Sequence, residues 1–155
     1  MATSYAQDGD AAGTFLGHPK GLFVLFFAEM WERFSYYGMR ALLIFYLTKH
    51  WLFSDEKSGV IYGAYTACAY LTPIFGGFIA DRYLGKRRAI IIGASIMAVG
   101  HFMMAFEPMF YFALGTIAIG NGLFLPSLPS QINDLYAPGD PRRGWAYNVY
   151  YVGIN

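Results

Sequence analysis

Long apolar stretches alternate with short polar connections along this chain of 155 residues. Four stretches, at roughly residues 21–48, 58–80, 89–106 and 110–135, are near or above the length of about 20 residues that crosses a bilayer as a helix. A fifth begins near Trp145 and is interrupted at Asn155. The pattern predicts an all-α membrane protein with four transmembrane helices and the start of a fifth. Because a span should not end within its first turns, we expect the N-terminal part of a longer protein.

The first apolar stretch contains four ionisable side chains, namely Glu29, Glu32, Arg33 and Arg40. An ionisable group at membrane depth costs several kcal/mol unless it is paired or faces water. At about 100° per residue, Arg33 and Arg40 share a helical face with Glu29 and Tyr36, while Glu32 and Tyr37 lie at its edges. The spacing therefore predicts a charged stripe that faces the interior of a bundle. A soluble amphipathic helix with surface ion pairs is the alternative.

Composition argues against the soluble alternative. The chain is 56% hydrophobic, 19% aromatic and only 14% charged, which is too apolar for a soluble domain of this length. A formal net charge of +1 leaves no basic patch for nucleic acid. The lone Cys68 has no partner for an intramolecular disulfide. We therefore expect a lipid bilayer, and no nucleic acid, as the surroundings of the chain.

The positions of the basic residues predict the orientation. Seven of the eleven Lys and Arg residues fall on the N-terminal side of the predicted membrane, namely Lys20, Arg82, Lys86, Arg87, Arg88, Arg142 and Arg143. The positive-inside rule assigns that side to the cytoplasm. We expect a multi-pass protein of the cell (inner) membrane, with residues 1–19 as a disordered cytoplasmic tail because they are small, polar and acidic. Residues 20–155 would form an incomplete N-terminal bundle.

The connection between the second and third spans carries a recognisable motif. It resembles the G-x-x-x-D-R-x-G-[RK]-[RK] loop of the major facilitator superfamily, and the residues that carry the resemblance are Gly77, Asp81, Arg82, Gly85, Lys86 and Arg87. The resemblance implies a cytoplasmic gate in which Asp81 pairs with a base or a helix terminus. The glycines would allow two helices to approach closely. An ordinary positive-inside turn is the alternative.

The first span resembles a narrower family within that superfamily. Its residues Glu29, Glu32, Arg33, Phe34, Tyr36 and Tyr37 match every fixed position of the ExxERFxYY motif of the proton-coupled oligopeptide transporters. Residues 77–100 are similar to that family's signature around the second and third helices, and residues 150–155 to the opening of its FYxxINxG signature. The resemblance implies a bacterial transporter of two six-helix bundles that takes up di- and tripeptides with protons by alternating access. Such a protein is no enzyme, needs no cofactor besides the coupling protons, and is expected to be monomeric.

The resemblance also implies roles for single residues. Arg33 and Arg40 would hold the carboxylate of the peptide, for which their forked donors are suited, and Asn155 would meet the backbone or the amino end. Four tyrosines would supply pocket walls with a polar tip, namely Tyr36, Tyr37, Tyr65 and Tyr70. For Tyr37 and Tyr70, plain helix packing is the alternative.

Proton coupling would fall to Glu29 and Glu32, either of which could carry the proton. Protonation would free Arg33 to bind the substrate. In the fourth span the chain departs from the family, because Leu125 stands where relatives commonly carry a lysine, and no Lys or Arg lies between residues 110 and 135. We therefore predict that coupling depends on exchange between the glutamates and the arginine of the first helix.

Other readings of the sequence remain open. A symporter of another anion or of a peptide-like drug would keep the same motifs, and a non-transporting membrane scaffold would keep the fold. Pro126 and Pro129 should kink the fourth helix, either as a hinge or only for packing. His18 and His50 are expected to be peripheral and His101 structural or lipid-facing, so a metal site has no support.

Overall fold

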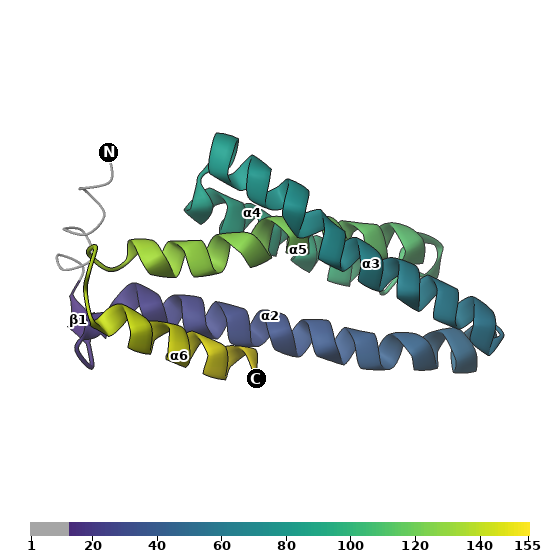
Figure 1. Ribbon diagram of the computed structural model, residues 1–155. Helices are drawn as coiled ribbons and strands as arrows, with labels where there is room; N and C mark the ends of the chain where they lie inside the picture. Colours follow the sequence, from purple (N-terminus) through teal and green to yellow (C-terminus); the bar gives the residue numbers. More distant parts are fainter. Residues whose placement is uncertain (1–12) are drawn as a thin grey trace. The chain divides into compact units, whose positions relative to one another are not determined.

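The computed structural model describes residues 13–155, and these are almost entirely helical (Figure 1). The elements are β1 (Thr14–Phe15), β2 (His18–Pro19), α2 (Lys20–Phe45), α3 (Asp55–Ile79), α4 (Lys86–Met103), α5 (Phe110–Asp134) and α6 (Arg142–Ile154). Short π-helical turns at Tyr46–His50 and Ala80–Leu84 extend α2 and α3. The prediction of an all-α chain is confirmed, and each long helix lies within a few residues of its predicted place.

Local sequence explains where the helices begin. Ser54 caps α3, since its side chain accepts a hydrogen bond from the backbone N–H of Lys57 at 3.2 Å, and Asp55 and Glu56 complement the positive end of the helix dipole. Gly85 precedes α4 with a φ of 79°, a conformation that favours glycine. The sharp turn between α3 and α4 therefore depends on a residue of the loop motif.

The chain divides into two compact units, which are described separately. The first comprises the residues up to Tyr37 together with Leu128–Asn155, and the second comprises Gly38–Ser127. Helices α2 and α5 contribute residues to both.

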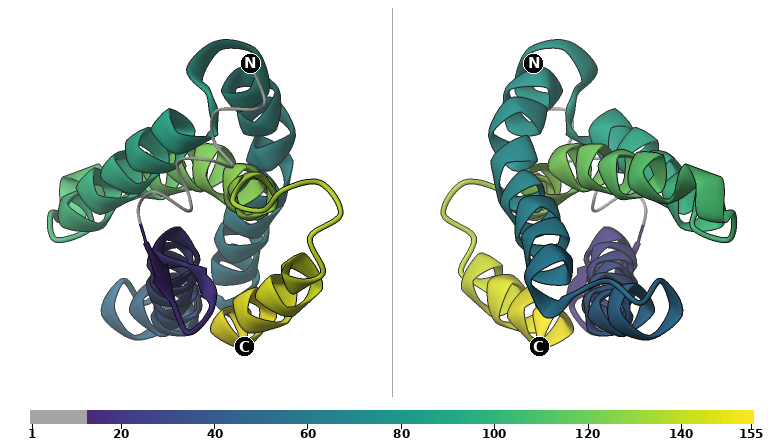
Figure 2. Two further views of the ribbon diagram at one scale, coloured as in Figure 1. Left: turned by 90° about the vertical axis from the view of Figure 1, so that its left-hand side faces the viewer. Right: turned by 90° about the vertical axis from the view of Figure 1, so that its right-hand side faces the viewer.

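In the second unit, α3 and α4 pack closely on α5 through glycines (Figure 2). A Cβ atom added to Gly76 would lie 2.1 Å from the carbonyl oxygen of Gly122, and one added to Gly93 would lie 2.7 Å from that of Gly120. Pro126 has no N–H to offer the Gly122 carbonyl one turn earlier, and Gly76 approaches that carbonyl. Glycines therefore allow close helix approach at these pairs. The two loop-motif glycines differ, since a Cβ added to Gly77 would make an ordinary contact with Pro126 and one added to Gly85 would meet no atom within 4 Å.

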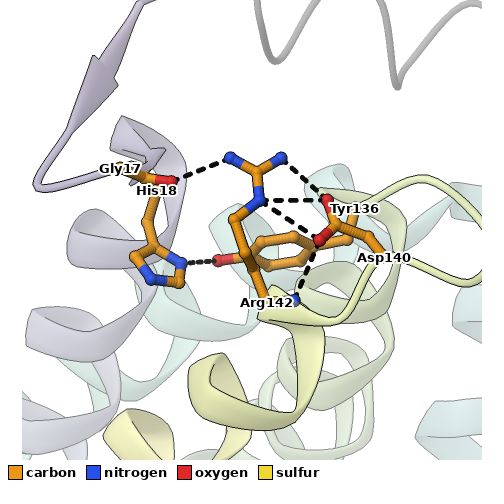
Figure 3. Close-up of polar contacts among 5 residues, drawn as sticks. All are labelled: Gly17, His18, Tyr136, Asp140 and Arg142. Atoms are coloured by element: carbon orange, nitrogen blue, oxygen red, sulfur yellow. Dashed lines mark hydrogen bonds and ion pairs between the residues drawn. The ribbon is translucent and has the colours of Figure 1, made fainter.

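In the first unit, a short hairpin precedes α2 and is fixed to the connection between α5 and α6 (Figure 3). The buried His18 places Nδ1 2.8 Å from the Tyr136 hydroxyl and stacks on Trp145 with ring centroids 4.4 Å apart. Arg142 donates from Nη1 to the carbonyl oxygen of Gly17 at 2.8 Å.

The hairpin differs from the predicted disordered tail, and His18 is not peripheral. Residues 14–19 form two strands that pair with each other and the turn between them. The contact that fixes them, from His18 to Tyr136, spans 118 residues, so no local pattern reveals it. The rest of the predicted tail, residues 1–12, lies outside the described residues.

Asp140 makes the attachment of the hairpin to the connection between α5 and α6 pH-dependent. Arg142 donates to it from the backbone N at 2.9 Å and from Nη2 at 2.7 Å, and the side-chain hydrogen bond from Arg142 holds the pKa of Asp140 below its ordinary value. A carboxyl whose pKa is lowered by folding stabilises the fold above its unfolded pKa of about 3.9, and that contribution is lost as the pH falls through the folded value.

We therefore expect Asp140→Asn to weaken hydrogen-exchange protection of the hairpin amides at pH 7. The difference between variant and parent should shrink as the pH falls through the lowered pKa of Asp140, because the parent side chain is then neutral as well. Asp55→Asn, which removes an equal charge at the start of α3, should leave the hairpin unchanged. Exchange mass spectrometry measures this, and equal protection of variant and parent at pH 7 would contradict it.

One stretch of the described residues, Glu107–Asp134, is long and apolar enough to cross a membrane by length and composition, with a mean hydropathy of 1.4. This stretch contains α5. Helix α2 has a comparable length but carries five charged residues, three of them near mid-helix. The number of helices that cross the membrane therefore stays a prediction.

Candidate functional site

Three ionisable side chains of α2 form one cluster in the first unit. Arg33 donates from Nε to Oε1 of Glu29 at 2.8 Å and forms an ion pair with Oε2 of Glu32 at 3.2 Å. The side chains of Glu29, Glu32 and Arg33 are 0%, 5% and 15% exposed. Two carboxyl groups thus contact the same nitrogen of one guanidinium, in a region that is nearly closed to solvent.

The sequence of α2 explains this arrangement. Residues three and four apart lie side by side on a helix, which brings Glu29, Glu32 and Arg33 together. Large apolar side chains occupy another face and are exposed, namely Val24, Phe27, Trp31 and Phe34. The charged side chains therefore turn away from the apolar surface of the helix, as the sequence predicts.

The cluster has an excess of carboxyl oxygens. Oε2 of Glu29 and Oε2 of Glu32 are buried, and neither has a hydrogen-bond partner among the described residues. A buried oxygen that lacks a donor costs about 1–3 kcal/mol, and more when it is charged. If both glutamates are ionised, two negative charges face one positive charge. A proton on one of the carboxyl groups neutralises the cluster.

Two tyrosines adjoin the cluster within the first unit. The guanidinium of Arg33 lies 5.8 Å from the ring centre of Tyr36, which is suited to a cation–π contact. Tyr150 of α6 is 4% exposed and interacts electrostatically with Glu29, Arg33 and Glu32. Sequence reasoning assigned a role to Tyr36 but none to Tyr150, whose only signal is its place in the fifth-helix signature.

Arg40 belongs to the second unit and has a partner that the sequence did not indicate. It donates from Nε and Nη2 to the hydroxyl of Tyr62 on α3, at 2.8 and 2.5 Å. Its guanidinium also lies 5.3 Å from the centre of the Tyr62 ring. Tyr62 therefore fixes the head group of this arginine.

The other predicted binding residues differ in exposure. Tyr36 in the first unit and Tyr65 in the second are buried. Tyr37 and Tyr70 are 52% and 69% exposed. Asn155 is exposed, and its side-chain amide donates to the backbone carbonyl of Tyr151 at 2.7 Å. The roles predicted for these residues stay predictions.

The predicted gate motif forms the turn between α3 and α4 in the second unit. Gly77 faces Pro126, from which an added Cβ would be 3.4 Å away. Asp81 and Arg82 are exposed on the π-helical turn. After Gly85, α4 begins with Lys86 and Arg87. The motif thus presents both signs of charge at one end of these helices.

Comparison with known proteins assigns the chain to a family. Residues 22–155 match the family profile of the Major Facilitator Superfamily. Dipeptide and tripeptide permease B of Xenorhabdus bovienii is 40% identical over 141 residues, which are 88% of this chain and 29% of the permease. The uncharacterized transporter YclF of Bacillus subtilis is 40% identical over 149 residues, which are 91% of this chain and 30% of that protein.

Solved structures show the same likeness. The crystal structure of a peptide transporter POT mutant in complex with alafosfalin matches with a TM-score of 0.89 and 38% identity, covering 96% of this chain and 33% of that one. A POT family transporter in complex with 5-aminolevulinic acid matches with a TM-score of 0.86 and 36% identity, covering 91% and 31%.

The chain spans about three tenths of the length of these relatives. The resemblance to the oligopeptide transporters that the motifs indicate is confirmed, and the chain belongs to the major facilitator superfamily.

Proposed function

We propose that this chain forms the first helices of a proton-coupled symporter of di- and tripeptides that works by alternating access. The similarity to dipeptide and tripeptide permeases supports the substrate class. The observation that carries the mechanism is the Arg33 guanidinium held by two buried carboxyl groups. Such a group can exchange one negative partner for another.

The exchange couples the proton to the peptide. When a proton neutralises one glutamate, the attraction of that glutamate for Arg33 falls, and the guanidinium becomes available to the carboxylate of a peptide. Guanidinium and carboxylate pair through two parallel hydrogen bonds. Because coupling between two ligands is reciprocal, a bound peptide carboxylate also favours protonation of the glutamate. Proton and peptide are then carried together.

Roles for further residues follow from the family and from their placement in each unit. In the first unit, Arg33 holds the peptide carboxylate, Asn155 meets the backbone or amino end, and Tyr36 and Tyr37 supply binding surface. In the second unit, Arg40 is a further carboxylate donor, held by Tyr62. The remaining candidates for binding surface in that unit are Tyr65 and Tyr70.

We place the chain in the cell membrane as a multi-pass protein with its N-terminus in the cytoplasm. Helices α2, α3, α4 and α5 each cross the bilayer in this proposal, and α6 begins a fifth crossing, so residues 20–155 are part of an N-terminal bundle. The turn with Asp81 and Arg82 then lies on the cytoplasmic side, where it serves as a gate. The transporter works as a monomer.

Two of the related structures suggest a second candidate function. Relatives were crystallised with alafosfalin and with 5-aminolevulinic acid. The second compound is an amino acid with no peptide bond, so a protein of this fold binds a compound that is not a peptide. A symporter of such compounds would keep the same cluster on α2.

A competition assay separates the two functions. We expect the complete protein in proteoliposomes to accumulate labelled dialanine when the outside is acidic, and a protonophore to abolish the accumulation. Excess unlabelled dialanine should reduce the uptake at least about tenfold, the effect expected at ten times its Kd, whereas alanine should not compete. Competition by 5-aminolevulinic acid but not by dialanine would favour the second candidate.

A further inference from the structure

Only one oxygen of the Glu29 carboxyl group accepts a hydrogen bond from the described residues. Oε1 accepts from Arg33, while Oε2 is buried and has no hydrogen-bond partner among residues 13–155. Glu29 is 0% exposed, so water does not reach its side chain from the surface. A hydrogen-bond donor from a neighbouring helix would remove the free-energy cost of leaving that buried oxygen without a partner.

Helix α6 lies alongside α2 within the first unit and brings such a donor (Figure 1). A Cβ atom added to Gly153 would lie 3.0 Å from the ring of Phe26 and 3.3 Å from its carbonyl oxygen. Tyr150 lies one turn before Gly153 on the same side of α6, and it is 4% exposed. The close approach at Gly153 thus carries the Tyr150 ring into the interface with α2.

The charged and titratable groups around this carboxyl can be named. Within the first unit, α2 contributes Glu32 and Arg33, together with Tyr37, which interacts with Arg33. Helix α6 contributes Tyr150, which interacts electrostatically with Glu29. A phenol carries one O–H that it can donate.

We propose that Tyr150 is a positioning residue that donates its hydroxyl hydrogen to Oε2 of Glu29 and thereby leaves Glu32 to take up the coupling proton. The inference rests on the proposed function, since a coupling proton presupposes proton-driven transport. The fifth-helix signature begins with phenylalanine where this chain has Tyr150. The hydroxyl is therefore an addition to that signature, in a chain that has Leu125 in place of the usual lysine.

The two carboxyl groups are then no longer equivalent. Glu29 accepts from Arg33 at one oxygen and from Tyr150 at the other, and hydrogen bonds to a carboxylate favour its charged form. Glu32 has only the longer contact of 3.2 Å to the Nε atom that already donates to Glu29. The proton goes to the glutamate with fewer donors. Arg33 stays bonded to Glu29 until a substrate carboxylate replaces that partner.

The pH dependence of dialanine uptake tests the proposal in the complete protein. Tyr150→Phe keeps the ring and removes only the hydroxyl, so Glu29 begins to compete for the proton. We expect the midpoint of the uptake profile to move to higher pH by about one unit, the size expected when a hydrogen bond to a charged group is lost. An unchanged midpoint would overturn the proposal.

A matched control lies one turn earlier on the same helix. The hydroxyl of Tyr147 donates to the backbone carbonyl of Pro129 at 3.3 Å and not to the cluster. Tyr147→Phe should therefore leave the midpoint in place. In a Glu29→Gln background, Tyr150→Phe should cause no further shift, because the carboxylate that it serves is gone. A full shift in that background would show that Tyr150 acts elsewhere.

A second measurement does not depend on transport. Infrared difference spectra of the purified complete protein, recorded during acidification, report the carboxyl groups that become protonated. We expect the carboxyl band to persist in Glu29→Gln, to be lost in Glu32→Gln, and to reappear when Tyr150→Phe is added to Glu32→Gln. Its absence from that double variant would refute the role of Tyr150. Absence of dialanine uptake with the expected bands would refute only the proposed function.

Discussion

Replacing Gly76 by alanine is expected to destabilise the protein by about 3 kcal/mol or more, at the upper end of the cost of overpacking. The added methyl group would lie 2.1 Å from the carbonyl oxygen of Gly122, 2.3 Å from its carbonyl carbon and 2.8 Å from the backbone nitrogen of Leu123. All three atoms are backbone, so no side chain can rotate away, and α3 and α5 must separate. Thermal unfolding of the purified complete protein measures the loss.

The control variant is Gly63→Ala on the same helix. No atom lies within 4 Å of a Cβ placed at Gly63, and alanine is favoured over glycine within a helix by about 0.5–1 kcal/mol. This variant should melt at the parent temperature or slightly above it. If both variants melted alike, the tight approach of α3 to α5 would not contribute to stability.

The helices could be predicted because each is an apolar run that ends at local signals. Ser54 and Gly85 mark the beginning of α3 and α4 by their own chemistry. The hairpin before α2 could not be predicted. It depends on contacts between His18 and Tyr136, and between Arg142 and Gly17. These pairs are more than one hundred residues apart, so only the folded chain brings them together.

Within the candidate site, contacts between residues of one helix could be predicted, but contacts between helices could not. Helical spacing places Glu29, Glu32 and Arg33 together, and their burial follows from the apolar residues on the rest of the helix. The partners from other helices were missed. Tyr62 and Tyr150 look like ordinary packing residues in the sequence. Nothing in the local pattern shows that Tyr62 accepts from an arginine or that Tyr150 interacts with the charged cluster.

In the proposed function, Leu125 restricts which residues can couple the proton to the peptide. Residues 110–135 contain no Lys or Arg, so α5 supplies no base that could compete for the glutamates of α2. In the first unit the base bonded to these carboxyl groups is Arg33, on the same helix. Protonation of one of these glutamates must then act by weakening its interaction with Arg33.

Glu32→Gln is therefore expected to abolish proton-driven uptake of dialanine and to spare counterflow. Glutamine has nearly the shape of a protonated glutamate but can neither take up nor release a proton. The variant should hold Arg33 permanently in the substrate-ready state, so the binding site still exchanges peptide across the membrane. Proteoliposomes loaded with unlabelled dialanine measure counterflow without a proton gradient, and the same vesicles with an acidic outside measure driven uptake.

Two further variants show whether such a loss is specific. Glu56→Gln removes an exposed carboxylate in the first turn of α3 and should retain both activities. Arg33→Lys keeps the positive charge but loses the fork that pairs with a carboxylate through two bonds, so both activities should fall. If Glu32→Gln instead lost both activities to the same degree, its carboxyl group would serve binding and not the proton. The separation of the two activities is what distinguishes a proton carrier from a residue that only shapes the site.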